Sequence, residues 1–242
     1  MRYSLIIPTL NEEKLLPGLL NQICQIEYQK KYLYEVIIAD GGSTDNTLTL
    51  AREFPCFISS DCDTGSQNIA KGRNQGASSA RGEILIFLNA DVRMPDVDHF
   101  FTVFNREFYQ SPSGAMTCRV EVFPDERKWS DTLFHAFYNQ YFYMLNRCGV
   151  GMGRGECQIV RRSVFEEVGG YNDNLAAGED FDLFRRIRRH YPVYFCKKLV
   201  IFESPRRYRH YGYWKVAWQW TKNALSVMLR NRSYSNEWEP IR

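Results

Sequence analysis

The stretch YSLIIPTLNE at residues 3–12 decides the fold, together with YEVIIADGGST at residues 34–44. Each stretch is an apolar run that ends in turn-forming residues, and leucines at helical spacing lie between the two runs, over residues 12–26. A weaker strand pattern at 56–59, a helical segment over 68–80 and the apolar run at 83–88 continue the alternation. Strands and helices that alternate at this spacing predict a parallel, doubly wound α/β sheet.

The loops that follow three of these strands carry polar residues. They span 8–12, 40–43 and 89–91. Ligands of open α/β sheets bind at the carboxyl ends of the strands. The sequence therefore predicts a binding site that is formed by these three loops.

Beyond Met94 the alternation is weaker. We expect helices over 98–109, 130–145, 180–190 and 214–230, and strands over 115–123, 158–161 and 193–202, with a glycine-rich loop at 149–155. No segment has the composition of a linker between domains. The pattern therefore favours one domain with a mixed central sheet flanked by helices.

Composition excludes several classes of protein. With 44% hydrophobic and 24% charged residues, the chain is neither disordered nor of low complexity. Apolar runs are short and the mean hydropathy is −0.43, so we expect no membrane-spanning helix. Met1 leads directly into an apolar strand without an export signal, and seven scattered cysteines without a C-x-x-C pair indicate reduced thiols. We therefore expect a cytoplasmic protein.

The net charge of +3 conceals a strong asymmetry. Residues 185–242 contain 14 Lys and Arg against 3 Asp and Glu, a local charge of +11, and the rest of the chain carries −8. A basic segment of this kind favours an anionic partner: a phosphate, an acidic lipid surface or nucleic acid, among which composition does not choose. We expect no nucleic acid partner, because charge asymmetry alone is poor evidence for one.

Six motifs in a fixed order carry a family resemblance. They are PTLNEE at 8–13, DGGSTDNT at 40–47, GRNQG at 72–76 with RGE at 81–83, FLNAD at 87–91, RRSVFEEVGGY at 161–171 and GEDFDL at 178–183. In this order they resemble family 2 of the inverting nucleotide-sugar glycosyltransferases, with the GT-A fold. SPRR at 204–207 is similar to the Ser-Ala-Arg-Arg signature of a bacterial subgroup. By contrast, no G-x-G-x-x-G follows the first strand, which excludes a dinucleotide dehydrogenase.

The resemblance implies a domain organisation and a reaction. Residues 1–242 would form a single glycosyltransferase domain, with a nucleotide-binding half (1–93), an acceptor-side half (94–213) and a C-terminal amphipathic helix and tail (214–242). The enzyme would be a hexosyltransferase that moves a sugar, with inversion, from a nucleotide diphosphate donor to an unidentified acceptor hydroxyl. UDP is favoured over GDP. The alternative is a nucleotide-sugar-binding protein on a degenerate scaffold, without catalysis.

By resemblance, a divalent metal, Mn²⁺ or Mg²⁺, neutralises the leaving diphosphate, and hard cations of this kind prefer carboxylate oxygens. The family holds it with Asp-x-Asp, but here the triplet is NAD at 89–91. Asp91 is therefore the expected metal ligand, while Asn89 is left to contact nucleotide or sugar. Asp61 and Asp63 also form an Asp-x-Asp triplet, but it lies one strand before the position of the family motif. We interpret these two residues as part of a solvated turn.

The resemblance also assigns the nucleotide pocket. Its expected residues are Pro8, Thr9, Leu10, Asn11, Glu12, Asp40, Gly41, Gly42, Arg73, Asn89 and Ala90. Asp40 would accept a hydrogen bond from the uracil ring N–H, although an Asx turn that opens the glycine loop also accounts for an aspartate there. Arg73 would contact phosphate or base, or else form an ordinary salt bridge on a helix surface.

The catalytic base follows from the same resemblance. Inversion needs a carboxylate to take the proton of the acceptor hydroxyl, and Asp180 beside Glu179 is the expected base. The alternative is that these acids only stabilise a helix N-terminus. Arg206 and Arg207 are a candidate clamp for the diphosphate, or else part of a solvated basic face.

Two aromatic helices leave a choice open. The predicted helix at 130–145 has aromatic residues at the spacing of a core face: Phe134, Phe137, Tyr138, Tyr141 and Phe142. We therefore interpret them as part of the core, and contact with acceptor or lipid is the less favoured alternative. The helix at 214–230 combines Trp214 and Trp218 with basic residues. It either docks on its own domain, which we prefer, or lies on an anionic membrane as a peripheral contact.

Overall fold

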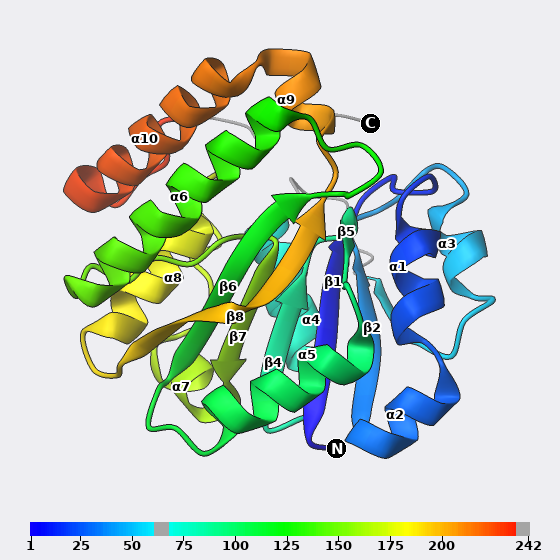
Figure 1. Ribbon diagram of the computed structural model, residues 1–242. Helices are drawn as coiled ribbons and strands as arrows, with labels where there is room; N and C mark the ends of the chain where they lie inside the picture. The colour runs from blue at the N-terminus through cyan, green and yellow to red at the C-terminus, as the bar shows by residue number, and fades with distance from the viewer. Residues whose placement is uncertain (61–67, 236–242) are drawn as a thin grey trace.

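The computed structural model describes residues 1–60 and 68–235, so Asp61 and Asp63 lie outside the described residues. In the described part, eight strands form one sheet in the order β3-β2-β1-β4-β7-β6-β8-β5 (Figure 1). The strands are β1 (Tyr3–Thr9), β2 (Tyr34–Asp40), β3 (Phe57–Ser60), β4 (Ile84–Leu88), β5 (Val92–Arg93), β6 (Ala115–Val122), β7 (Cys157–Arg161) and β8 (Val193–Glu203).

The first four strands in this order are parallel, as the alternating pattern predicts. β2 is buried along its whole length, which explains why the central run at 36–39 is apolar at every position rather than alternating. Pro8 pairs with Ala39 of β2, but β1 pairs with β4 only as far as Ile6. Pro8 has no N–H to donate, but no hydrogen bond between β1 and β4 is lost, because the pairing of these two strands ends before Pro8.

The second half of the sheet has mixed directions. β7 is antiparallel to both β4 and β6, whereas β8 is parallel to β6, with a register shift between Cys118 and Arg119. The short β5, which the sequence pattern does not predict, pairs with the end of β8. The predicted mixed α/β sheet is therefore confirmed, and β5 places Asp91 beside the end of β8.

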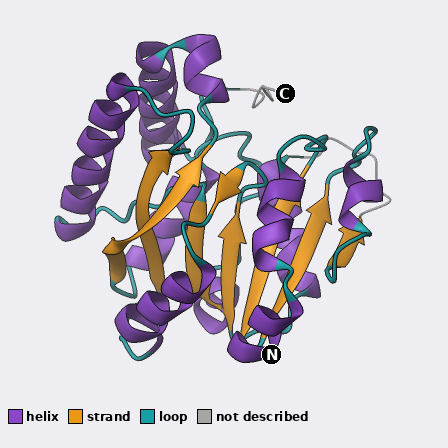
Figure 2. Cartoon of the chain, turned by 45° about the vertical axis from the view of Figure 1, so that its right-hand side comes forward, coloured by secondary structure: helices purple, strands orange, loops and turns teal. Residues whose placement is uncertain are grey.

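Helices cover both faces of the sheet (Figure 2). They are α1 (Leu16–Ile23), α2 (Ile26–Tyr32), α3 (Thr47–Ala51), α4 (Ile69–Ser79), α5 (Val97–Phe104), the π-helix η1 (Asn105–Tyr109), α6 (Trp129–Arg147), α7 (Arg162–Glu167), α8 (Glu179–Arg188), α9 (Arg206–Tyr211) and α10 (Tyr213–Arg230). The first predicted helix begins four residues late and breaks before Ile26, and α9 has no counterpart in the prediction. Among the described residues, no helix is long and apolar enough to cross a bilayer.

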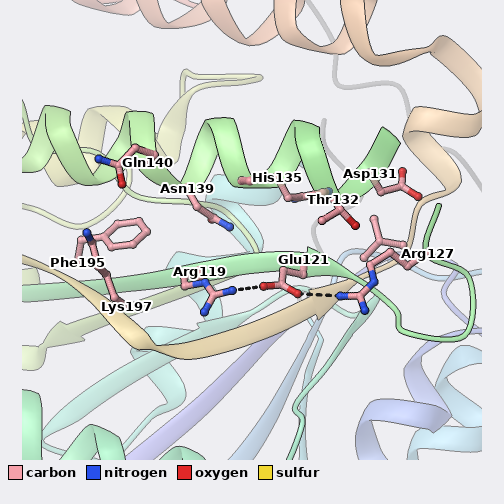
Figure 3. A pocket seen from close by; sticks show the side chains of 12 residues that line it. Arg119, Glu121, Arg127, Asp131, Thr132, His135, Asn139, Gln140, Phe195 and Lys197 are labelled. Atoms are coloured by element: carbon pink, nitrogen blue, oxygen red, sulfur yellow. Dashed lines mark hydrogen bonds and ion pairs between the residues drawn. The ribbon is translucent and has the colours of Figure 1, made fainter. Parts of the chain in front are cut away.

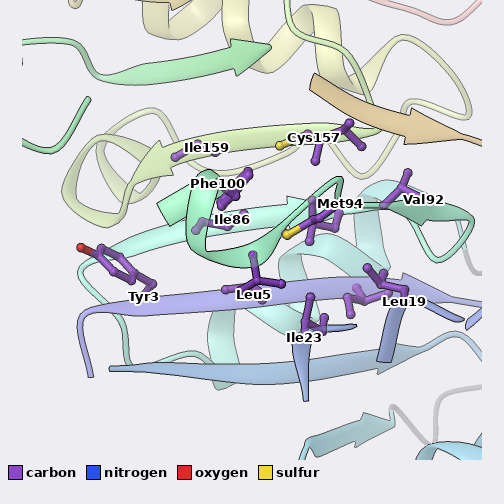
Figure 4. Close-up of a cluster of buried hydrophobic side chains, with 14 of the residues drawn as sticks. Tyr3, Leu5, Leu19, Ile23, Ile86, Val92, Met94, Phe100, Cys157 and Ile159 are labelled. Carbon is purple, nitrogen blue, oxygen red and sulfur yellow. The ribbon is translucent and has the colours of Figure 1, made fainter. Parts of the chain in front are cut away.

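Three buried clusters hold these layers together. The largest joins odd-numbered residues of β1 to α1 and α5, and Figure 4 shows Leu5, Leu19 and Phe100 among its side chains. On the opposite face, Ile6 and Phe87 contribute to a second cluster with α4, α7 and α8. A third, smaller cluster includes residues of α6, α8 and α10, such as Phe142 and Val227. The helix at 214–230 therefore docks on its own domain through one face, as preferred from the sequence.

Candidate active site

A cavity of about 860 Å³ lies at the carboxyl ends of β1 and β4, with α4, α8, α9 and α10 contributing to its walls. Most of the predicted site residues line it: Pro8, Thr9, Leu10, Glu12, Gly41, Arg73, Asn89, Ala90, Asp91, Glu179, Asp180, Arg206 and Arg207. Asn11, Asp40 and Gly42 are not part of the lining. Segments that are far apart in the sequence thus meet where the strand ends predict a site.

Asp40 and Asn11 bind the neighbouring loops. The Asp40 carboxylate accepts hydrogen bonds from the backbone N–H groups of Gly42, at 2.9 Å, and Ser43, at 3.0 Å, which forms the Asx turn. Asn11 has a left-handed backbone (φ 53°), and its Oδ1 accepts from the N–H of Thr44 at 2.7 Å. Both side chains therefore fix the shape of the loops that border the cavity.

Arg73 is buried rather than on a helix surface, with 1% of its side chain exposed. Its Nη1 donates to Glu179 Oε1 at 2.6 Å, while Nη2 donates to Asn89 Oδ1 at 3.0 Å and to the carbonyl oxygen of Gly155 at 2.9 Å. The guanidinium also lies 5.2 Å from the ring centroid of Tyr171. Arg73 thus joins α4, the end of β4 and the start of α8 in one buried ionic network.

The acids at the start of α8 have separate surroundings. Gly178 is the N-cap residue with a left-handed backbone, and no side chain caps this helix. Asp182 forms an ion pair with Arg186 at 2.7 Å, and Glu179 binds Arg73. Asp180 lines the cavity, and its Oδ1 also accepts a hydrogen bond of 2.8 Å from the backbone N–H of Phe181 in the first turn of α8.

The pKa of Asp180 is raised to about 7. Burial is the largest cause, and the negative charge of the adjacent Glu179 adds to it, while the positive charge of Arg73 opposes both. A carboxyl with this pKa exchanges a proton near neutral pH, which suits a general base.

Gly155 marks the point where the site side chains converge. A Cβ atom on Gly155 would lie 3.3 Å from Arg73 Nη2, 3.7 Å from Asp180 Oδ2 and 3.8 Å from Asn89 Nδ2. A Cβ at 155 would therefore crowd the Arg73 guanidinium and be in van der Waals contact with Asp180 and Asn89. A sequence pattern indicates a glycine-rich loop here, but not what it accommodates.

Arg206, the first residue of α9, bridges two carboxylates. Its guanidinium donates two hydrogen bonds to Glu12, at 2.6 and 3.0 Å, and Nη2 lies 3.0 Å from Asp91 Oδ2. Burial would lower the pKa of Arg206, but the hydrogen bond to Glu12 and the charge of Asp91 raise it above its usual value. Arg207 lines the same cavity, and burial lowers its pKa.

The donor set around Asp91 does not fit a metal held by the protein alone. Asp91 is already paired with Arg206, and Asn89 Oδ1 accepts from Arg73. In the described part of the chain, no three His, Cys, Asp or Glu side chains gather in a way that would hold a metal ion. A cation at Asp91 would need Arg206 to withdraw and the ligand to supply the remaining oxygens.

Sequence reasoning missed a second ionic cluster on the cavity wall. Arg154 is buried and contacts Glu156, at 3.2 Å, and Glu203, at 3.1 Å, and Tyr208 donates to Glu203 at 2.7 Å. Burial and the nearby Glu156 charge raise the pKa of Glu203 well above its usual value, whereas Arg154 keeps Glu156 ionised. A charged residue inside the glycine-rich loop is the one sequence signal that could have indicated this cluster.

A smaller cavity of about 350 Å³ lies between α6 and the strands β6 and β8 (Figure 3). Glu121 lies there between two arginines, Arg119 and Arg127, and forms ion pairs with both. His135 borders this cavity and is buried, which lowers its pKa to about 3. None of the predicted site residues is among its lining residues.

Comparison with known proteins identifies relatives of this arrangement. A family model described as Glycosyl transferase family 2 matches residues 4–169. The O-antigen chain rhamnosyltransferase of Salmonella typhimurium is 28% identical over 217 residues, which cover 84% of this chain and 67% of that protein.

Two solved structures share the fold. A mannosyltransferase from Pyrobaculum calidifontis, in complex with GDP-Man and Mn²⁺, has a TM-score of 0.70 and 23% identity, over 93% of this chain and 61% of that one. S. aureus TarS in complex with UDP-GlcNAc has a TM-score of 0.65 and 19% identity, over 84% of this chain and 58% of that one. The chain spans about three-fifths of each solved chain. The likeness of the two structures to this chain confirms the predicted GT-A fold.

Proposed function

Because the chain belongs to glycosyl transferase family 2, a family of sugar-transferring enzymes, we propose that it is a hexosyltransferase that uses a nucleotide diphosphate sugar. The sugar passes to an acceptor hydroxyl with inversion at C1. The observation that carries this proposal is Asp180, a cavity carboxyl whose pKa of about 7 suits a base at neutral pH.

In the proposed reaction, the Asp180 carboxylate takes the proton of the acceptor hydroxyl while the oxygen attacks C1 from the face opposite the leaving group. Arg73 holds Glu179 and Asn89, and so fixes the cavity wall next to Asp180. Its charge also limits the rise in the pKa of Asp180, which keeps the base ionisable near neutral pH.

The nucleotide half of the proposed site comprises the loops after β1, β2 and β4. Pro8, Thr9, Leu10, Glu12, Gly41 and Ala90 line the cavity there. Asp40 is not among the lining residues, and its carboxylate closes the turn after β2. We propose that it also accepts a hydrogen bond from the ring N–H of uracil, which favours UDP over GDP. Asn11 and Gly42 then act by shaping the loops, and residues 94–213 supply the acceptor side.

We propose that Arg206 and Arg207 neutralise the leaving diphosphate, since guanidinium groups bind phosphate oxygens in bidentate geometry. Arg206 already lies 3.0 Å from Asp91, at the position where the family resemblance implies a metal. A divalent metal, Mn²⁺ or Mg²⁺, would supply the same charge compensation if Asp91 and the donor phosphates bound it together.

Calorimetric titration with UDP, GDP and dTDP, each with Mn²⁺ and with EDTA, tests the donor site. We expect UDP to bind most tightly and to retain affinity in EDTA because the arginines remain. The release of nucleotide from a nucleotide sugar, whose nucleotide is the one that binds most tightly, then tests turnover. Binding without any release would favour the non-catalytic nucleotide-sugar-binding alternative, and no binding of any nucleotide would contradict the proposal.

A further inference from the structure

Two neighbouring helices, α6 and α10, expose large apolar side chains along their outer faces. On α6 the exposed fractions are 77% for Trp129, 51% for Leu133, 65% for Phe137, 45% for Tyr141 and 54% for Met144. On α10 they are 90% for Trp214, 60% for Trp218, 48% for Leu225 and 76% for Leu229. We call these nine residues the outer apolar surface. Spacings of three, four and seven place each set on one side of its helix.

The inner faces of the same helices pack together. Ring centroids of Tyr138 and Trp220 are 5.3 Å apart, and those of Phe134 and Tyr213 are 5.0 Å apart. Figures 1 and 2 both show α6 and α10 side by side at one end of the sheet. The predicted aromatic core face of α6 is therefore divided: Phe134, Tyr138 and Phe142 face inward, whereas Phe137 and Tyr141 are exposed.

On the two helices that carry the outer apolar surface, the exposed charges have one sign, while exposed Asp125 and Glu126 precede α6 next to Arg127 and Lys128. Across the 37 residues of α6 and α10, the one acidic residue is Asp131, which is buried and paired with Arg209. The basic residues of the two helices are Arg147, Lys215, Lys222 and Arg230. An apolar surface with basic and no exposed acidic side chains is complementary to an anionic lipid bilayer.

We propose that the outer apolar surface lies on an anionic membrane, with the tryptophan and phenylalanine rings at the level of the headgroups. A second copy of the chain fits less well, because a two-fold interface through this surface would bring together the basic residues of both copies without an exposed acidic residue of these helices to pair with them. Phe142 and Trp220 line the large cavity from the inner sides of these helices. A bilayer on the outer sides would thus lie about one helix diameter, ~10 Å, from the cavity.

Vesicle flotation of the full chain tests this proposal without any nucleotide, and so independently of the proposed function. We expect binding to phosphatidylcholine vesicles that contain about 30% phosphatidylglycerol, and roughly tenfold weaker binding to pure phosphatidylcholine or in about 0.5 M NaCl. Tryptophan fluorescence should shift to shorter wavelength on binding. Equal partitioning into neutral and anionic vesicles, or none into either, would overturn the proposal.

Matched variants locate the contact. The triple variant Phe137→Ser, Trp214→Ser and Trp218→Ser should lose at least roughly tenfold in partitioning. Phe57→Ser, which removes a 56% exposed ring from β3 at the far edge of the sheet, should bind like the wild type. Circular dichroism and UDP titration of each variant verify folding.

Charge reversal provides a second readout. Lys215→Glu with Arg230→Glu should weaken binding to anionic vesicles at least roughly tenfold, whereas Lys30→Glu on α2 should not. Sedimentation equilibrium in the absence of lipid measures whether the chain associates with itself. A dimer that the triple variant abolishes, together with equal vesicle binding by all variants, would assign the surface to a second copy and overturn the membrane proposal.

Discussion

At the scale of single residues, the account depends on the protonation of Asp180. A carboxyl works as a base only when it is ionised, and burial together with the charge of Glu179 raises the pKa of Asp180 to about 7. The cost of burying this charge is therefore offset only in part by Arg73. The same balance makes the proposed reaction sensitive to pH in a range where ordinary aspartates are always ionised.

We predict that the rate of sugar transfer falls as the pH drops below about 7, because Asp180 becomes protonated. Glu179→Gln removes a negative charge that raises the pKa of Asp180, so this acidic limb should move to lower pH, to between about 4 and 7. A pH–rate profile of both proteins measures the shift. An acidic limb at the same pH in the variant would contradict this explanation of the pKa.

Arg73 is predicted to contribute to stability as well as to the site. Arg73→Gln leaves the Glu179 carboxylate buried without its partner, which should lower the free energy of unfolding by about 3–5 kcal/mol. Urea denaturation measures this loss. Arg81→Gln is the control: Arg81 is 74% exposed in its pair with Glu35, so about 1 kcal/mol or less is expected. Equal losses in both variants would contradict the role given to Arg73.

At the scale of elements, α9 brings a basic segment onto loops from the other end of the chain. Arg206 and Glu12 are 194 residues apart in sequence, yet they form a bidentate pair. The sequence motifs predicted that both residues belong to the site, because each lies in a recognisable pattern. They did not predict the pair, because α9 has no pattern of its own and its position depends on how β8 and β5 meet.

Arg206→Gln should weaken UDP binding in EDTA at least roughly tenfold, because charge-assisted bonds to the diphosphate are lost. In Mn²⁺ the loss should be smaller, since removal of Arg206 leaves Asp91 unpaired and open to a cation. Calorimetry measures both affinities. Arg230→Gln, which removes one charge from the end of α10, is the matched control and should bind UDP normally. An unchanged affinity in the Arg206 variant would remove it from the diphosphate site.

At the scale of the whole molecule, the sequence predicted the parallel half of the sheet better than the mixed half. β1, β2 and β4 each contain an apolar run and lead into a motif loop, so their common edge could be inferred. In the other half β7 lies between β4 and β6, and β6 shifts register against β8, so adjacency does not follow chain order. The Arg154 cluster depends on that pairing, so the charged residue inside the glycine-rich loop indicated a site there without indicating its partners.

The central claim is that Asp180 is the base for sugar transfer, and one comparison tests it most directly. Nucleotide release from UDP-sugar in the presence of acceptor, together with the affinity for UDP, should be measured for the wild type and for Asp180→Asn. We predict a loss of about 10²-fold or more in turnover with nearly unchanged UDP affinity, because the base acts in the transition state. Full turnover by Asp180→Asn would contradict the claim, as would an equal loss of UDP binding.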